Sequence, residues 1–192
     1  ADGSIEAWGW VGESDSAAPT DNGYTAIYSN AGSFAALKAD GSIVAWGDPI
    51  TGGGDAPTDD GYTAIYSTGG AFAALKGDGS ITAWGNAQQG ASGAPTDSGY
   101  TSIYRTEAAF AALKADGSIT AWGNPALGGS GAPTDSGYTS IYSTQSAFAA
   151  LKADGSITAW GAALSRDSGP PADSGYTALY SNQSAFAALK ED

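Results

Sequence analysis

The side chains of this sequence that could perform chemistry are carboxylates. The chain has 192 residues, with 20 acidic and 7 basic side chains, and it contains no histidine, cysteine or methionine. Without histidine a Ser–His–Asp triad cannot form, and the commonest metal ligand is missing. Two carboxylates can hydrolyse glycosides, but nothing in the sequence pairs the loop acids or raises a pKa among them. We therefore expect no catalytic residues and a protein that is not an enzyme. The loop acids considered are Glu13, Asp48, Glu107 and Asp167.

A second set of carboxylates recurs at fixed positions and could hold Ca²⁺, which prefers several oxygen ligands. No unit has the dense D-x-[DN]-x-[DN]-G spacing of a calcium loop, and Asp before Gly is ordinary turn chemistry. We expect these residues to form turns without a metal or cofactor, with Ca²⁺ binding at the turns as the alternative. The two series are Asp2, Asp40, Asp78, Asp116, Asp154 and Asp192, and Asp21, Asp59, Asp97, Asp135 and Asp173.

An internal repeat sets the organisation of the whole chain. The string Asp-Gly-Ser-Ile recurs every 38 residues without insertion or deletion, and nearly every aromatic residue keeps its place in the repeat. This period predicts one domain, 1–192, built from five units. Their bounds are 1–38, 39–76, 77–114, 115–152 and 153–190.

Each unit carries three segments with strand character: Gly-Ser-Ile-x-Ala-Trp-Gly, Tyr-Thr-x-Ile-Tyr-Ser and Phe-Ala-Ala-Leu-Lys. The first two combine β-branched and aromatic residues between turn formers, and the third runs directly into an Asp-Gly turn, a strong hairpin signal. Bulky side chains project to both faces of these strands, as in sheets covered on both sides. The pattern predicts an all-β, five-bladed β-propeller with three-stranded blades.

The last unit lacks its third strand, and the first residues lack the strand that should precede them. Pairing the two ends would close a ring and remove both exposed edges. We expect that closure within a monomer. An open array from a longer protein and a ring shared between chains are the alternatives.

The stretch Ala149–Gly161, A-A-L-K-A-D-G-S-I-T-A-W-G, resembles the repeat of the regulator-of-chromosome-condensation propeller family, with its A-L-x-x-D-G-x-[VI]-x-x-W-G core. The Ala-Pro-Thr-Asp-Ser-Gly run before an aromatic-rich strand is most similar to the secreted bacterial β-lactamase-inhibitor propeller of that superfamily. The resemblance implies a disc of small radial sheets whose loops bind other proteins, without catalytic residues. The chain departs from the family in having Ser-Phe or Ala-Phe in place of a His-Ser-type pair, and five units instead of seven. The inhibitor's partner is therefore not carried over.

Two loops vary among the units, one after Trp-Gly and one after the Tyr strand. Strand parity places both on the same face of each blade, opposite the Asp-Gly hairpins. A fixed scaffold with variable loops on one face is typical of a recognition module, although surface loops also drift without selection. Trp10 is the sharpest candidate, because an exposed Trp is a typical hot spot of binding. The predicted binding residues are Trp10, Glu13, Asp48, Asn86, Gln88, Arg105, Glu107, Asn124, Gln145, Arg166 and Gln183.

Charge and hydropathy limit the partners. The net charge of −13 disfavours nucleic acid, whose binding depends on basic side chains, and no apolar run is long enough for a membrane span. We expect a secreted, acidic binding protein outside a bacterial cell, with a protein partner at the variable loops. The alternatives are a carbohydrate-binding propeller with repeated sites between blades, and a structural or engineered repeat scaffold without a natural ligand.

Overall fold

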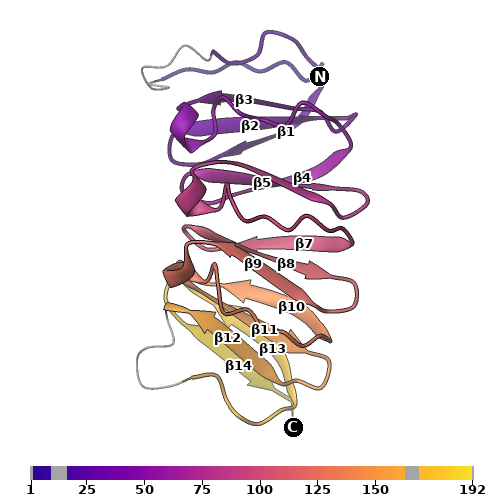
Figure 1. Cartoon of the computed structure of the whole chain (residues 1–192), viewed down its shortest axis with the longest axis vertical. Coiled ribbons are helices and arrows are strands. Elements are labelled where there is room, and N and C mark those ends of the chain that lie inside the picture. The colour runs from indigo at the N-terminus through magenta and orange to yellow at the C-terminus, as the bar shows by residue number, and fades with distance from the viewer. Residues whose placement is uncertain (1, 10–16, 163–168, 192) are drawn as a thin grey trace. The chain divides into compact units, whose positions relative to one another are not determined.

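The computed structural model describes residues 2–9, 17–162 and 169–191, and the chain divides into two compact units, Ala1–Ser98 and Gly99–Asp192. The first unit contains two sheets, β1–β2–β3 and β4–β5–β6, and the second contains β7–β8–β9, β10–β11–β12 and the two-stranded β13–β14 (Figure 1). The all-β prediction with repeated three-stranded antiparallel sheets is therefore confirmed. The strands of the first unit are β1 (Tyr24–Ser29), β2 (Ser33–Lys38), β3 (Ile43–Gly47), β4 (Tyr62–Ser67), β5 (Ala71–Lys76) and β6 (Ile81–Gly85). Those of the second are β7 (Tyr100–Arg105), β8 (Ala109–Lys114), β9 (Ile119–Gly123), β10 (Tyr138–Ser143), β11 (Ala147–Lys152), β12 (Ile157–Gly161), β13 (Tyr176–Ser181) and β14 (Phe186–Lys190).

The Phe-Ala-Ala-Leu-Lys strand is the central strand of every complete sheet. In the second sheet β5 pairs antiparallel with both β4 and β6, and Phe72 lies opposite Trp84 while Leu75 lies opposite Ile81. Ala and Leu favour helices in isolation, but a five- or six-residue segment is too short for a stable helix and gains a full set of backbone hydrogen bonds between two strands.

The Asp-Gly hairpin between the second and third strands is closed by its own side chains. The Asp78 carboxylate accepts hydrogen bonds from the backbone N–H of Ser80 at 2.9 Å and from its hydroxyl at 2.7 Å. Gly79 has a φ of 80°, in the left-handed region where a side chain is disfavoured. The hairpin expected from the sequence is thus built as predicted.

Apolar side chains fill the space between neighbouring sheets within each unit. In the first unit Leu37 and Ile43 of the first sheet pack with Ile65, Phe72 and Trp84 of the second. The Phe72 ring stacks on Trp84 with centroids 5.2 Å apart, and the Phe side chain is fully buried. In the second unit the sheet β10–β11–β12 is covered on both faces, by one apolar cluster around Phe148 and Trp160 and another around Leu151 and Leu179. This double coverage explains why apolar and polar residues do not alternate along its strands.

The buried indoles are also tied to the backbone of the preceding repeat. The Trp84 N–H donates to the Gly52 carbonyl at 3.0 Å, and the Trp160 N–H donates to the Gly128 carbonyl at 3.1 Å, in each case 32 residues earlier. For Trp46 the same spacing leads to Ser14, which lies outside the described residues. One repeat is thus joined to the next by packing and by hydrogen bonds.

One of the fifteen expected strands is not formed. Residues 2–9 belong to no sheet of the described chain, although the Gly3 carbonyl accepts from Tyr24 N as the Gly41 carbonyl does from Tyr62 N. The side chain of Trp8 is 88% exposed, whereas the four Trp residues of the complete sheets are 2–5% exposed. A strand forms only where an adjacent strand supplies hydrogen-bond partners for its backbone N–H and C=O groups. The expected pairing of the two chain ends stays a prediction.

Candidate functional site

The two variable loops of a repeat meet and hydrogen-bond to each other. The Thr68 hydroxyl, after β4, donates to the Gln89 carbonyl at 2.8 Å, at the end of the 3₁₀ helix η2 (Ala87–Gln89) that follows Trp84. In the second unit Thr106 donates to the Leu127 carbonyl at 2.9 Å, at the end of η3 (Pro125–Leu127). The placement of both loops on one face of the blade is therefore confirmed.

The residue after the Tyr strand hydrogen-bonds to both variable loops through its side chain, and we call this pair of bonds the clamp. The buried Thr106 hydroxyl also accepts from the Ala109 N–H at 3.1 Å, which closes the turn into β8. Asn30 makes the same connections with an amide: its nitrogen donates to the Thr51 carbonyl at 2.6 Å, and its oxygen accepts from Ser33 N at 2.9 Å. A short polar side chain at this position is required by the backbone groups around it.

Three of the predicted binding residues serve as caps of the short helices. The side chains of Asp48, Asn86 and Asn124 accept from the backbone N–H two residues later, at 2.9–3.0 Å. Asp48 precedes η1 (Pro49–Thr51). Asp and Asn are favoured at N-caps for this reason, and Pro is favoured directly after the cap, as in Asp48-Pro49 and Asn124-Pro125. That sequence signal could have identified them as structural residues.

A row of exposed variable side chains remains at the turns after the Tyr strands. Glu107 N donates to the Gln145 carbonyl at 2.9 Å, and Gln145 N donates to the Gln183 carbonyl at 3.0 Å. Because one backbone hydrogen bond links each pair, the three backbones are held roughly 5 Å apart, as in a sheet. We call Glu107, Gln145 and Gln183 the tip row, and all three side chains are exposed.

The other predicted binding residues lie nearby or outside the described chain. Arg105 is exposed at the end of β7, two residues before the tip row begins, and Gln88 is exposed on η2. Trp10, Glu13 and Arg166 lie outside the described residues. The structure therefore brings together four of the predicted residues: Arg105, Glu107, Gln145 and Gln183.

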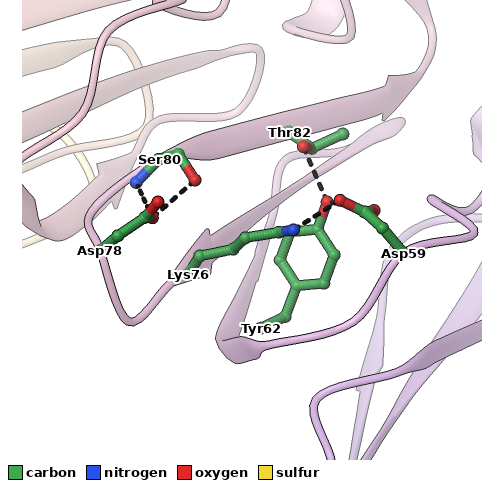
Figure 2. Close-up of polar contacts among 6 residues, drawn as sticks. All are labelled: Asp59, Tyr62, Lys76, Asp78, Ser80 and Thr82. Atoms are coloured by element: carbon green, nitrogen blue, oxygen red, sulfur yellow. Dashed lines mark hydrogen bonds and ion pairs between the residues drawn. The ribbon is translucent and has the colours of Figure 1, made fainter.

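The opposite end of each sheet carries a repeated cluster of charged or polar side chains. In Figure 2 the Asp59 carboxylate accepts from the Tyr62 hydroxyl at 2.9 Å and from the Lys76 ammonium at 2.5 Å. The ammonium lies 4.8 Å from the centre of the Tyr62 ring, and Thr82 Oγ1 lies 2.8 Å from the Tyr62 hydroxyl. Every charged group of this cluster is thus engaged with another member of it.

The electrostatics of this cluster follow from those contacts. The hydrogen bond from Lys76, and next that from Tyr62, hold the pKa of Asp59 below its ordinary value. Burial raises the pKa of Tyr62, and the bond to Asp59 raises that of Lys76. A carboxylate stabilised in its charged form is unsuited to act as a general acid or base near neutral pH.

The repeated aspartates are used within the fold. One carboxylate oxygen of Asp78, Oδ1, accepts two hydrogen bonds from Ser80, and the Asp59 carboxylate is bonded to Tyr62 and Lys76. Within residues 2–9, 17–162 and 169–191, no three acidic side chains gather closely enough to hold a metal ion. The same residues include no helix long and apolar enough to cross a membrane.

The comparisons with known proteins identify the fold and not the family. No protein-family model matches the sequence, and no curated protein matches it significantly. Among solved structures, the chain is similar to the ectodomain of the Physcomitrella patens receptor kinase CR4, with a TM-score of 0.58 and 19% identity over 83% of this chain and 44% of that one. It is also similar to the CRINKLY WD40 ectodomain of the Arabidopsis thaliana receptor kinase ACR4, with a TM-score of 0.59 and 16% identity over 85% of this chain and 59% of that one.

A third similar structure is Prp20p from Saccharomyces cerevisiae, described together with its binding to Gsp1p and histones. Its TM-score is 0.51, with 17% identity over 72% of this chain and 43% of that one. Together these similarities support a propeller repeat fold for the chain. The chain spans about half the length of these structures.

Proposed function

We propose that this protein is a non-catalytic binding module that presents the variable loops of its sheets to a protein partner. The observation that carries this proposal is the tip row, in which backbone hydrogen bonds hold the backbones of three residues with exposed polar side chains at regular spacing. A backbone that is already ordered loses little conformational entropy on binding, so loops held in this way are suited to recognition. Glu107, Gln145 and Gln183 offer hydrogen-bond acceptors and donors, and Arg105 adds a cation beside them.

A protein partner is favoured over a sugar for a structural reason. Sugar recognition at repeated sites between blades would need exposed aromatic faces, but Trp46, Trp84, Trp122 and Trp160 are buried. Their faces are covered by Phe side chains and neighbouring strands, as for Phe72 on Trp84. The tip row has polar side chains and is open to solvent, which fits the polar contacts of a protein surface.

The test replaces the tip row and leaves the scaffold unchanged. The variant E107A/Q145A/Q183A keeps every backbone hydrogen bond, and the matched control A115Q/A153Q adds exposed side chains at the Asp-Gly hairpins of the same unit. Both variants and the wild-type chain are immobilised, and the proteins that each retains from cells of the source are quantified by mass spectrometry. We expect at least one protein to be retained by the wild type and the control and lost, at least tenfold, with the tip-row variant.

Equal retention by all three chains would place the binding surface elsewhere. No specific retention by any chain would favour the scaffold without a natural ligand. A screen with chromogenic glycosides tests the absence of catalysis, for which we expect no turnover.

We also propose, from the repeat pattern, that the five repeats form one ring in which residues 3–9 complete the sheet β13–β14 of a monomer. The protein is proposed to lie outside a bacterial cell, which rests on its resemblance to the secreted inhibitor propellers and on its acidic composition. Light scattering tests the first of these proposals, and fractionation of the source cells tests the second.

A further inference from the structure

The sheet β13–β14 has an unpaired edge in the described chain. In the complete sheets the Phe-Ala-Ala-Leu-Lys strand pairs with a strand on each side, whereas β14 pairs only with β13. One face of this sheet is also uncovered: Leu189 is 47% exposed and Tyr180 is 60% exposed, whereas Leu75, the counterpart of Leu189, is 6% exposed. In the first unit the equivalent face is covered by the next sheet, against which Leu37 and Tyr28 pack. An edge strand with exposed apolar side chains is a template for pairing with another strand.

The chain also contains an unpaired segment with the sequence of the missing strand. Residues 5–9 read I-E-A-W-G, against I-V-A-W-G in β3 and I-T-A-W-G in β6, β9 and β12. Only Glu6 departs from these third strands, at a position where the side chain is polar in three of the four. In the described chain residues 5–9 form no strand, and Trp8 is 88% exposed.

The complete sheets define the geometry of this pairing. In all of them the Phe of the central strand lies opposite the Trp of the third strand. The Ala directly after that Phe lies opposite the Ala before the Trp, and the Leu lies opposite the Ile. The Phe and Trp rings stack with centroids 5.2–5.3 Å apart. Transferred to β14, the register places Trp8 opposite Phe186, Ala7 opposite Ala187, and Ile5 opposite Leu189.

We propose that, as the protein concentration rises, residues 5–9 of a second copy of this chain bind along the edge of β14 in that register, in place of the chain's own residues 5–9. The occupant is a second copy because the chain repeats this interface four times within its own described sheets, so both surfaces are already matched in sequence. Residues 5–9 can also pair with β14 of their own chain, and the two arrangements then compete. Pairing within one chain has a fixed effective concentration, whereas the fraction paired between copies rises with protein concentration. Exchange of an identical element between copies is a low-barrier route to oligomers. This inference does not depend on the proposed binding function.

The experiment uses introduced cysteines, because the natural chain has none. Directly paired residues of antiparallel strands have Cα atoms about 4.5–5.5 Å apart, within the range of a disulfide. The full-length variant A7C is mixed with the full-length variant A187C, which carries a tag of distinct mass, and the mixture is oxidised at several concentrations. The heterodimer is then quantified on a non-reducing gel. Both alanines are exposed in the described chain, so neither substitution disturbs a core.

The matched control is A7C mixed with A188C, because Ala188 would face the position of Glu6 and point to the other side of the sheet. We expect the A7C–A187C heterodimer to exceed the A7C–A188C heterodimer at least fivefold, with a yield that rises with concentration. Equal yields from the two mixtures would overturn the proposal. The double variant A7C/A187C separates this result from ring closure: a cross-link within one chain, without any register-specific heterodimer in the mixtures, would support the closed monomer and exclude the joint between copies.

Discussion

The clamp between the two variable loops gives the sharpest test of how the site is held. Thr106 is 1% exposed, and its hydroxyl donates to the Leu127 carbonyl and accepts from the Ala109 N–H. The substitution Thr106→Val keeps the shape of the side chain and removes both hydrogen bonds. It therefore measures the polar contribution of the clamp with little change in packing.

The size of the effect follows from the two groups that lose a partner. A buried donor or acceptor left without a hydrogen bond destabilises a protein by about 1–3 kcal/mol. The Ala109 N–H and the Leu127 carbonyl both lose their partner, so we expect Thr106→Val to lower the free energy of unfolding by roughly 2–4 kcal/mol. For a chain of this size each kcal/mol lowers the melting temperature by about 2–4 °C.

The repeat itself supplies a rescue variant. Asn30 occupies the equivalent position in the first repeat, and its amide makes both connections, to the Thr51 carbonyl and to Ser33 N. Thr106→Asn should restore donor and acceptor, so we expect its stability to lie within about 1 kcal/mol of the wild type.

The assay is urea denaturation of the wild type and both variants, combined with hydrogen exchange of the Ala109 amide. We expect the midpoint to fall for Thr106→Val without a change in slope, and the Ala109 amide to exchange faster in that variant only. The reasoning is refuted if Thr106→Val is as stable as the wild type, or if Thr106→Asn is destabilised as much as Thr106→Val.

Three further predictions concern the scaffold. Gly85 has a φ of 105°, and a Cβ there would lie 2.8 Å from a carbonyl of the adjoining loop, so Gly85→Ala should lower the free energy of unfolding by at least about 2 kcal/mol. At Gly77 the nearest atom to an added Cβ is 3.9 Å away, so Gly77→Ala should raise the free energy of unfolding by about 0.4–1 kcal/mol. In a carboxyl NMR titration, Lys76→Ala should raise the pKa of Asp59 toward its ordinary value by more than Tyr62→Phe does, because the lysine contributes the largest lowering; the opposite order would contradict the assigned cause. Because the pKa of Asp59 is lowered in the folded state, the ionised carboxylate stabilises the fold above the ordinary carboxyl pKa of 3.8, and this stabilisation is lost as the pH falls below that value. The melting temperature should therefore decline on acidification through that range. A melting temperature that stays constant from pH 5 to pH 2 would contradict this prediction.

Much of the fold could be predicted from local sequence, because the same turn-forming and strand-forming residues recur in all five repeats. The Asp-Gly turn fixes each hairpin, and the alternation of strands fixes which loops share a face. The loops that contain Thr68 and Gln89 are therefore expected on one face, and the structure joins them by a hydrogen bond. The segment around Trp8 was also expected to be a strand, and the described chain leaves it outside every sheet. Strand formation there depends on a partner strand, which local sequence does not supply.

The candidate site divides in the same way. Variation among the repeats identified the loops, but it could not separate side chains that cap a helix from side chains that face solvent. Asp48, Asn86 and Asn124 vary little in chemistry because they bind the backbone, whereas Glu107 and Gln145 have side chains free of that role. Only the distances between atoms distinguish the two cases.

The sequence by itself determined the period, the strands of each repeat, the hairpins and the face on which the variable loops gather. These depend on backbone geometry and on residues close together in the chain. The tertiary structure decided which aromatic residues are buried, which polar loop residues are already bonded, and that the tips of successive repeats form one hydrogen-bonded row. Those properties depend on contacts about 20–40 residues apart in sequence, which exist only once the sheets have packed against each other.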